Sequence, residues 1–202
     1  MTSPVLDEAG LDADPIRQFR VWFDEAVRAN VPQPEAMVLS TATPPGRPSA
    51  RVVLMKAVDE GGFVFYTNYR SRKGRELEAN PHVALTFFWA EVGRQVRIEG
   101  AASRLTASES EAYFSSRPRE SQLGSLASAQ SEPIAGREEL DRRYRELDLL
   151  YRDRAVPRPS HWGGYRVKPE SIEFWQTRFA RLNDRILFTR SGMAWRRIRL
   201  QP

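Results

Sequence analysis

A cluster of basic and hydroxyl side chains beside a predicted helix start carries the clearest chemical signal in the sequence. Ser71 is a residue type that caps helices, and it precedes a helix that we predict from Arg72 to about Ala79. The first N–H groups of a helix attract anions, because they lack intrahelical acceptors and carry partial positive charge. Arg72, Lys73 and the Thr67 hydroxyl add partners at the same place. This pattern predicts an anion site, most naturally one for a phosphate.

Two further basic residues, Arg51 and Lys56, precede this site in a predicted β-hairpin. The hairpin comprises a strand over Arg51–Val58, a turn rich in glycine and a return strand over Phe63–Thr67. In an extended strand, Arg51 and Lys56 lie roughly 16 Å apart and on opposite faces. They therefore serve two phosphates, or one of them has another role. The alternative is a surface hairpin followed by a solvated basic helix start.

Three other groups of polar and aromatic residues could complete a larger ligand site. The first group surrounds a predicted helix end and the loop after it, and it suits a second phosphate: Tyr113, Arg117 and Ser121. The second group can hydrogen-bond the edge of a heteroaromatic ring: Gln95, Gln130 and Ser131. The third group gathers in one short segment near the C-terminus: Trp175, Arg181, Asn183 and Arg185.

The residues that usually carry catalysis by themselves are scarce in this chain. It has no cysteine and only two histidines, His82 and His161, so we predict no metal site. A Ser-His-Asp site would also need one of these histidines, and the sequence has no G-x-S-x-G motif. If the protein is an enzyme, a bound cofactor must therefore supply the difficult chemistry.

Composition narrows the class of protein further. The 202 residues carry a formal net charge of +5, but the arginines alternate with acidic residues, and no nucleic-acid-binding motif is present. We therefore predict no nucleic-acid partner. The sequence also lacks an apolar run of membrane-spanning length and a signal peptide, which favours a cytoplasmic location with no membrane contact.

The order of the predicted elements indicates the fold class. We predict a disordered tail over residues 1–13 and a single domain over residues 14–202. Many sequential strands with short turns and few helices favour an α+β protein, mainly β, with antiparallel strands closed or nearly closed into a barrel. Within this scheme, Ser116–Ser131 is predicted to be irregular. Tyr165–Val167 and Ile172–Gln176 are predicted to be separate strands.

Several motifs resemble the pyridoxamine 5′-phosphate oxidase family in order and spacing, from about Pro15 to the C-terminus. They are RVVLMK, FYTNYRSRKGREL, RQVRIEG, YFSSRPRESQLGS, SAQS, HWGGYRV, IEFWQTRFARLNDR and WRRIRLQP. The resemblance implies an FMN-binding split β-barrel that is active as a homodimer, with FMN at the subunit interface. It also implies oxidation of pyridoxamine or pyridoxine 5′-phosphate to pyridoxal 5′-phosphate. By this resemblance, hydride is expected to pass from the 4′ carbon of the phosphorylated pyridine to flavin N5, and O₂ to reoxidise the flavin with formation of H₂O₂.

The resemblance also assigns residues to each ligand. The residues implied for FMN are Arg51, Val52, Val53, Leu54, Met55, Lys56, Tyr66, Thr67, Arg72, Lys73, Gln95, Gln130, Ser131, Trp175 and Arg185. The residues implied for the substrate phosphate are Lys56, Tyr113, Arg117 and Ser121. Arg181 and Asn183 are implied to face the substrate ring and to act in catalysis.

The sequence departs from the family pattern mainly on the substrate side. Asn183 replaces a histidine in the family's R-L-H-D-R segment, and Leu126 replaces a tryptophan. Thr177 replaces a glycine, and the basic N-terminal segment that can cover the substrate is missing. Two alternatives therefore stay open: a flavin oxidase for another substrate, such as a phenazine precursor, and a flavin-binding protein without oxidase activity.

Overall fold

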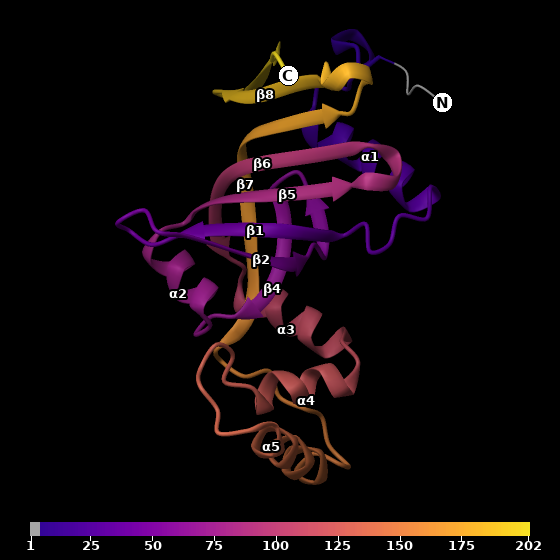
Figure 1. The fold of residues 1–202 in the computed structure, drawn as a ribbon. Coiled ribbons are helices and arrows are strands. Elements are labelled where there is room, and N and C mark those ends of the chain that lie inside the picture. Colours follow the sequence, from indigo (N-terminus) through magenta and orange to yellow (C-terminus); the bar gives the residue numbers. More distant parts are fainter. Residues whose placement is uncertain (1–4) are drawn as a thin grey trace.

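The protein is built on a curled antiparallel sheet of nine strands (Figure 1). The computed structural model describes residues 5–202. Seven strands follow the order β2-β1-β5-β6-β7-β4-β3, while β8 pairs with β7 and β9 pairs with β8. The strands are β1 (Ala36–Ala42), β2 (Pro48–Leu54), β3 (Ala57–Asp59), β4 (Gly62–Asn68), β5 (His82–Trp89), β6 (Arg94–Arg104), β7 (Trp162–Gln176), β8 (Asp184–Ser191) and β9 (Ala194–Arg199). The predicted antiparallel split barrel is confirmed.

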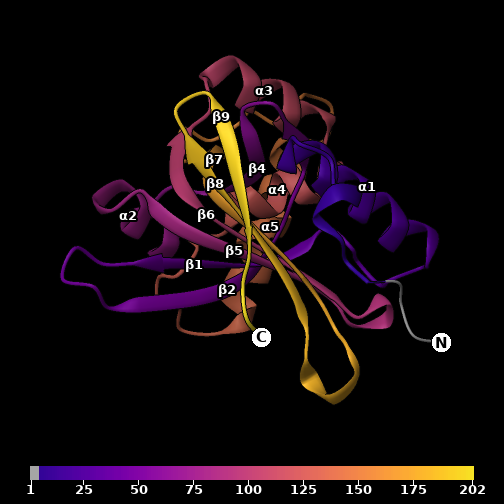
Figure 2. The same cartoon turned by 90° about the horizontal axis from the view of Figure 1, so that it is seen from above.

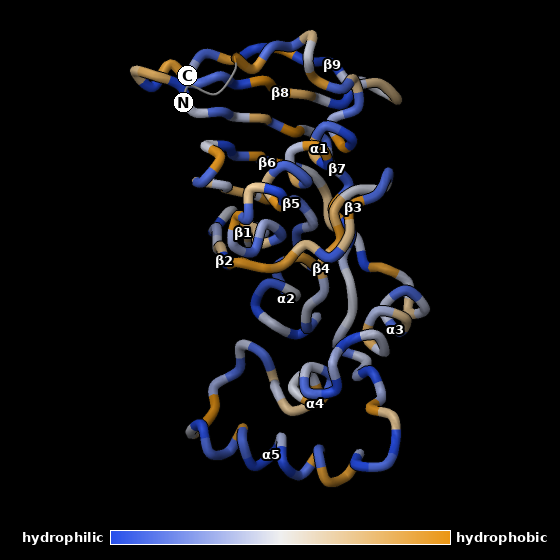
Figure 3. Tube along the Cα trace, turned by 90° about the vertical axis from the view of Figure 1, so that its right-hand side faces the viewer, coloured by the Kyte–Doolittle hydropathy of each residue, from blue (hydrophilic) through white to orange (hydrophobic). Residues whose placement is uncertain are grey.

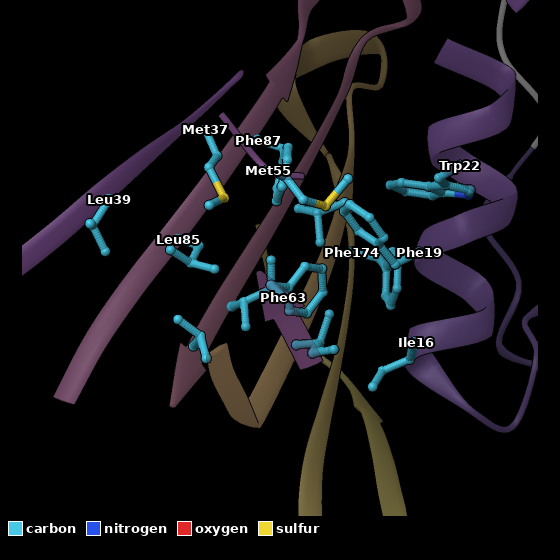
Figure 4. Close-up of a cluster of buried hydrophobic side chains, with 14 of the residues drawn as sticks. Ile16, Phe19, Trp22, Met37, Leu39, Met55, Phe63, Leu85, Phe87 and Phe174 are labelled. Carbon is cyan, nitrogen blue, oxygen red and sulfur yellow. The ribbon is translucent and has the colours of Figure 1, made fainter. Parts of the chain in front are cut away.

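Helix α1 (Pro15–Arg28) closes the core on one side of the sheet. Asp14 caps it by accepting a hydrogen bond from the Ile16 N–H, and Pro15 occupies its first turn. Its apolar face presents Ile16, Phe19 and Trp22 to the strands (Figure 4). Phe19 packs edge-on against Phe63 of β4, with ring centroids 4.8 Å apart. Full burial of such an aromatic side chain contributes about 1.5–3 kcal/mol, so this helix stabilises the barrel that carries the site.

Strand β7 is one continuous element of 15 residues, so the prediction of two separate strands was wrong. It pairs with β4 at one end, with β8 at the other and with β6 along most of its length. The register with β6 shifts between Glu99 and Gly100, opposite the stretch that contains Pro169. This irregularity accommodates the proline without ending the strand.

The predicted hairpin around Arg51 was wrong in its pairing. The strand breaks at Met55 and Lys56, and only β3 pairs with β4. Strand β2, which carries Arg51, pairs instead with β1. The tight return into β4 requires glycine at position 62, where φ is +125° and a Cβ atom would lie 2.0 Å from the Val167 carbonyl oxygen.

Three helices gather beyond the lower end of the sheet in Figure 1: α3 (Ala107–Ser116), α4 (Arg119–Ala127) and α5 (Arg137–Leu150). Helix α4 occupies much of the segment Ser116–Ser131, so the prediction of irregular structure there was wrong. Its Leu123 is 0% exposed and joins Phe114 and Trp162 in a second apolar cluster. Figure 3 shows α5 as mostly hydrophilic, with hydrophobic residues interspersed. Helices α3 and α4 line one side of the candidate site, together with α2 (Arg72–Ala79), whereas α5 does not line it.

The segment before α1 is held against the C-terminal strands, which differs from the disorder predicted for residues 1–13. Residues 1–4 lie outside the described residues, but Glu8–Gly10 form a 3₁₀ turn and Leu6 is buried. The Leu6 N–H donates to Asp184 at 3.1 Å, and Arg199 donates to the Leu6 carbonyl at 2.7 Å. This segment therefore adds hydrogen bonds between the two ends of the chain.

Candidate functional site

A cavity of about 820 Å³ lies between β2, β4, α2 and the helices α3 and α4. It brings together most of the residues that the sequence analysis selected: Arg51, Val52, Val53, Leu54, Lys56, Tyr66, Thr67, Arg72, Lys73, Tyr113, Arg117, Ser121, Gln130 and Ser131. Five of its lining residues are basic, and none of those in the described part of the chain is acidic. Met55 is buried in the core beside it. The cavity therefore favours a polyanionic ligand of small-molecule size.

Lys73 lies at the centre of the predicted anion site, in the first turn of α2. Ser71 caps this helix by accepting a hydrogen bond from the Gly74 N–H. The Lys73 ammonium donates to the hydroxyl oxygens of Thr67 and Ser71 at 3.1 and 3.2 Å, and to Gln130 Oε1 at 3.1 Å. Burial and the nearby Arg51 lower the pKa of Lys73 to about 8. An anion bound here would offset both the loss of hydration and the repulsion from Arg51 that destabilise the charged ammonium.

Arg51 and Arg72 share one buried acidic partner, Glu76 of α2. The Arg51 guanidinium lies 3.3 Å from Glu76 Oε2, and Arg72 Nε lies 2.9 Å from Glu76 Oε1. Sequence reasoning missed Glu76, which has the helical i, i+4 spacing to Arg72 that favours such a pair. The carboxylate thus holds two of the basic residues that line the cavity.

Lys56 lines the same cavity as Arg51, although the sequence analysis placed them on opposite faces of one strand. The reason is the break in the strand at Met55, which removes the simple alternation of side chains. Lys56 donates its backbone N–H to the Val64 carbonyl at 2.8 Å, so the chain has already crossed to β4. Both basic side chains can therefore contribute to one ligand site.

Stacked aromatic rings form another wall of the cavity, and Arg117 lies against it. Tyr66 stacks on Tyr113 with ring centroids 3.8 Å apart, and on Trp162 at 5.4 Å. The Arg117 guanidinium carbon lies 4.6 Å from the Trp162 ring centroid, and Arg117 Nη1 donates to Ser125 Oγ at 2.8 Å. Burial lowers the pKa of Arg117 and raises the pKa of Tyr66 and Tyr113. Arg117 is thus a second, partly desolvated cationic centre.

Sequence reasoning did not select Trp162 or Ser125 as site residues. Trp162 lies in the HWGGYRV motif, but only the fold places its ring beside Tyr66. Ser125 donates to the Ser121 carbonyl at 2.9 Å while it accepts from Arg117. Its contact with a predicted phosphate-binding arginine depends on helix α4, which the sequence analysis did not predict.

The remaining predicted residues lie away from this cavity. Gln95, Trp175 and Arg185 form a row across β6, β7 and β8, since Gln95 pairs with Trp175 and Trp175 pairs with Arg185. Arg185 Nε donates to Glu173 at 2.8 Å. None of these three lines the cavity. One chain therefore holds the predicted site as two separate parts.

Arg181 and Asn183 lie on the loop between β7 and β8, close to this second part of the site. The Asn183 side-chain oxygen accepts a hydrogen bond from the Arg178 N–H at 3.0 Å, which closes the loop. Ala180 and Arg181 both have positive φ values, 54° and 62°. Such backbone is costly for residues other than glycine, and both residues are exposed in the single chain.

The described residues offer no grouping of three or more His, Asp or Glu side chains that could hold a metal ion. Among the helices of residues 5–202, none is long and apolar enough to cross a membrane.

Comparisons with known proteins agree with the fold. Residues 23–151 match the pyridoxamine 5′-phosphate oxidase family, and residues 162–202 match the pyridoxine 5′-phosphate oxidase C-terminal dimerisation region. A pyridoxine/pyridoxamine 5′-phosphate oxidase of Rubrobacter xylanophilus is 64% identical over 197 residues, which are 98% of this chain and 91% of that protein. The corresponding protein of Paraburkholderia xenovorans is 55% identical over 199 residues, with 98% and 93% covered.

Solved structures give the same picture. The PhzG protein of Burkholderia lata, in complex with tetrahydrophenazine-1-carboxylic acid, superimposes with a TM-score of 0.94. It is 35% identical, and the match covers 100% of this chain and 99% of that protein. The two family matches together span most of the sequence, and the two oxidases are more than half identical to it along almost their whole length. This chain therefore belongs to the pyridoxamine 5′-phosphate oxidase family.

Proposed function

We propose that this protein is an FMN-dependent oxidase that converts pyridoxamine or pyridoxine 5′-phosphate to pyridoxal 5′-phosphate, with reduction of O₂ to H₂O₂. The observation that carries the proposal is the presence of two basic centres in one cavity. Lys73 with Arg51 and Arg72 forms one centre, and Arg117 forms the other beside Tyr113. Two phosphates, one from a cofactor and one from a substrate, match this arrangement.

The residues at the first centre fit the phosphate of FMN. Lys73 is buried with a pKa of about 8, and its partners Thr67 and Gln130 are neutral groups that leave its charge uncompensated. A phosphate would supply the missing negative charge, and it would also reach Arg51 and Arg72 at the cavity wall. Bound FMN supplies an electron-accepting ring that takes hydride from the substrate and passes electrons to O₂.

The second centre fits the phosphate of the substrate. Arg117 is fixed by its hydrogen bond to Ser125 and by the Trp162 ring beneath it. Ser121 and Tyr113 line the cavity next to it and offer hydroxyl groups. A phosphate held by these residues orients the pyridine ring within the cavity. The loop with Arg181 and Asn183 is proposed to face that ring and to orient, by hydrogen bonds, the group that loses a proton as the hydride leaves.

A homodimer would bring the two parts of the site together. In the second part of the site, every residue except Gln95 lies within residues 162–202, which match a dimerisation region. Its loop projects from the rest of the chain (Figure 2) and exposes two large apolar side chains, Phe179 at 90% and Leu182 at 68%. We propose that this loop and the row Gln95, Trp175 and Arg185 of one subunit complete the cavity of the other. A cytoplasmic location stays a prediction.

Subunit mixing tests this arrangement. We expect Lys73→Met and Arg185→Ala, each defective alone, to regain activity when the two proteins are unfolded together and refolded. A mixed dimer then has one site in which both parts are unaltered. If each subunit contained a whole site, mixing would restore nothing.

The identity of the substrate is tested by anaerobic mixing of the FMN-loaded protein with pyridoxamine 5′-phosphate. We expect the visible flavin absorbance to bleach, because the substrate passes hydride to the flavin when no O₂ is present. The similarity to PhzG favours one competing substrate class, tricyclic phenazine precursors without a phosphate. Bleaching by such a compound but not by pyridoxamine 5′-phosphate would support that function instead. No bleaching by either compound would leave a flavin-binding protein without this oxidase activity.

A further inference from the structure

Glu76 is a buried carboxylate behind the wall of the cavity. Its side chain does not line the cavity, and the residue is only 6% exposed. It projects from α2 toward β1 and β2, where it accepts hydrogen bonds from the hydroxyl groups of Thr41 and Ser49. An acidic residue buried behind a site for anions needs a physical reason, because its charge opposes anion binding.

The two oxygens of this carboxylate hold two different arginines. Oε1 accepts from Arg72 Nε at 2.9 Å, and Oε2 lies 3.3 Å from Arg51 Nη2. Arg51 also donates to Thr41 Oγ1 at 2.6 Å and to Ser49 Oγ. Burial acts to raise the pKa of Glu76, but hydrogen bonds from Ser49, Thr41 and Arg72 lower it to about 2. Glu76 is therefore ionised whenever the site is occupied.

The charges of Glu76 and the three nearby cations add up to a net charge that is equal in size and opposite in sign to that of a phosphate monoester. Arg51, Arg72 and Lys73 contribute three positive charges, and Glu76 contributes one negative charge. The remaining charge of +2 balances a phosphate monoester above its second pKa of about 6. Without the carboxylate, three cations would repel one another in the absence of ligand, and the two arginine side chains would lose a common anchor.

We propose that Glu76 is a positioning residue for the cofactor phosphate, acting through Arg51 and Arg72. The inference rests on the proposed binding of FMN at this centre and adds a residue that does not touch the ligand. Side chains already held in their binding geometry lose less conformational freedom when the ligand arrives. The proposal requires that the gain from preorganisation exceed the repulsion between the carboxylate and the phosphate.

The test compares two flavins that differ only in the phosphate. Wild-type protein and Glu76→Gln are freed of flavin and titrated with FMN and with riboflavin while flavin fluorescence is measured. Glutamine keeps acceptors for Thr41 and Ser49 but loses the ion pairs with both arginines. We expect FMN to bind about tenfold or more weakly to the variant, as for loss of a charge-assisted hydrogen bond. The riboflavin affinity should change less than about twofold, since riboflavin carries no charge for the arginines to bind.

Glu78→Gln is the matched control, because it removes the same charge from the same helix. Glu78 is exposed and pairs with Arg104, away from the cavity. We expect its FMN and riboflavin affinities to equal those of wild type. Glu76→Gln should weaken FMN binding less in an Arg72→Gln background than in the wild-type background. The reason is that the substituted residue 72 no longer has an ion pair with Glu76 to lose.

Four results would overturn the inference. One is unchanged or tighter FMN binding by Glu76→Gln, and another is an equal loss of FMN and riboflavin affinity. If Glu76→Gln does not fold, Thr41→Val replaces it. This variant removes the hydrogen bond that Thr41 donates to Glu76 and the one that it accepts from Arg51, and Thr41 does not line the cavity. An unchanged ratio of FMN to riboflavin affinity would then overturn the inference. Wild-type protein that binds riboflavin but not FMN would overturn the proposed cofactor as well.

Discussion

Replacement of Lys73 by methionine should have opposite effects on stability and on binding. It removes the destabilising effect of a buried charge on the flavin-free protein, and it removes the contribution of that charge to phosphate binding. Methionine keeps an unbranched apolar side chain of similar length but lacks the ammonium group. The Lys73 residue is only 8% exposed, and its three hydrogen-bond partners are uncharged. The charge is therefore poorly compensated in the protein without ligand, and a phosphate would be its principal counterion.

The magnitude follows from this geometry. A hydrogen bond to a charged group contributes about 1.5–3 kcal/mol, which corresponds to an FMN dissociation constant roughly 10- to 150-fold higher for Lys73→Met. The same substitution removes a desolvated charge, so the unfolding temperature of the flavin-free protein should not fall. Lys168→Met is the matched control, because this lysine is exposed on β7 and lies outside the cavity.

The pKa of about 8 adds a pH signature. Lys73 is charged below this pKa and becomes neutral above it, whereas a bound phosphate favours the charged form. FMN binding should therefore take up a proton above pH 8, and the affinity should fall by up to about tenfold per pH unit there. Titrations from pH 7 to 9.5 should show this slope for wild type and for Lys168→Met, but not for Lys73→Met. A flat wild-type profile, or FMN binding by Lys73→Met at wild-type strength, would refute the reasoning.

Three further outcomes are expected. Arg117→Ala should raise the KM for pyridoxamine 5′-phosphate about tenfold or more, because it removes a charged partner of the second phosphate. The FMN dissociation constant of this variant should stay within about twofold of the wild-type value. A loss of FMN affinity with an unchanged KM would mean that the two anion centres are exchanged. Asn183→His should raise kcat for pyridoxamine 5′-phosphate by up to about a hundredfold, because imidazole can accept a proton near neutral pH; equal rates in stopped-flow reduction would exclude this role. Purified protein should be yellow and dimeric; a colourless monomer that fails to bind added FMN in a titration would contradict the proposed cofactor and assembly.

The parts of the fold set by local sequence were predictable. Ser71 begins α2 where its hydroxyl caps the helix, and Asp14 with Pro15 begins α1. The residues of β1 also alternate between buried and more exposed positions, as is typical of a strand with one face on the core. The family resemblance selected most of the cavity-lining residues, and the structure brings these together. Their binding roles stay predictions.

The parts that were missed depend on contacts between distant segments. Helix α4 is rich in polar residues, and only the packing of Leu123 against Phe114 and Trp162 makes it part of a core. Glu76 looks like one of many charged helix residues until β1 and β2 supply Thr41 and Ser49, which lie 35 and 27 positions away in sequence. The separation of the row Gln95, Trp175 and Arg185 from the cavity is likewise visible only once the sheet is assembled.

The length and position of β7 also constrain the order in which the chain can fold. Strand β4 ends at Asn68, but β7, its partner on one side, begins only at Trp162, so this pairing closes a loop of more than ninety residues. Until β7 emerges from the ribosome, β4 and β6 each present an unpaired edge that can recruit other chains. Such non-local pairing slows folding. Chains that terminate before Trp162 should therefore aggregate during synthesis, and the last fifth of the protein completes the barrel.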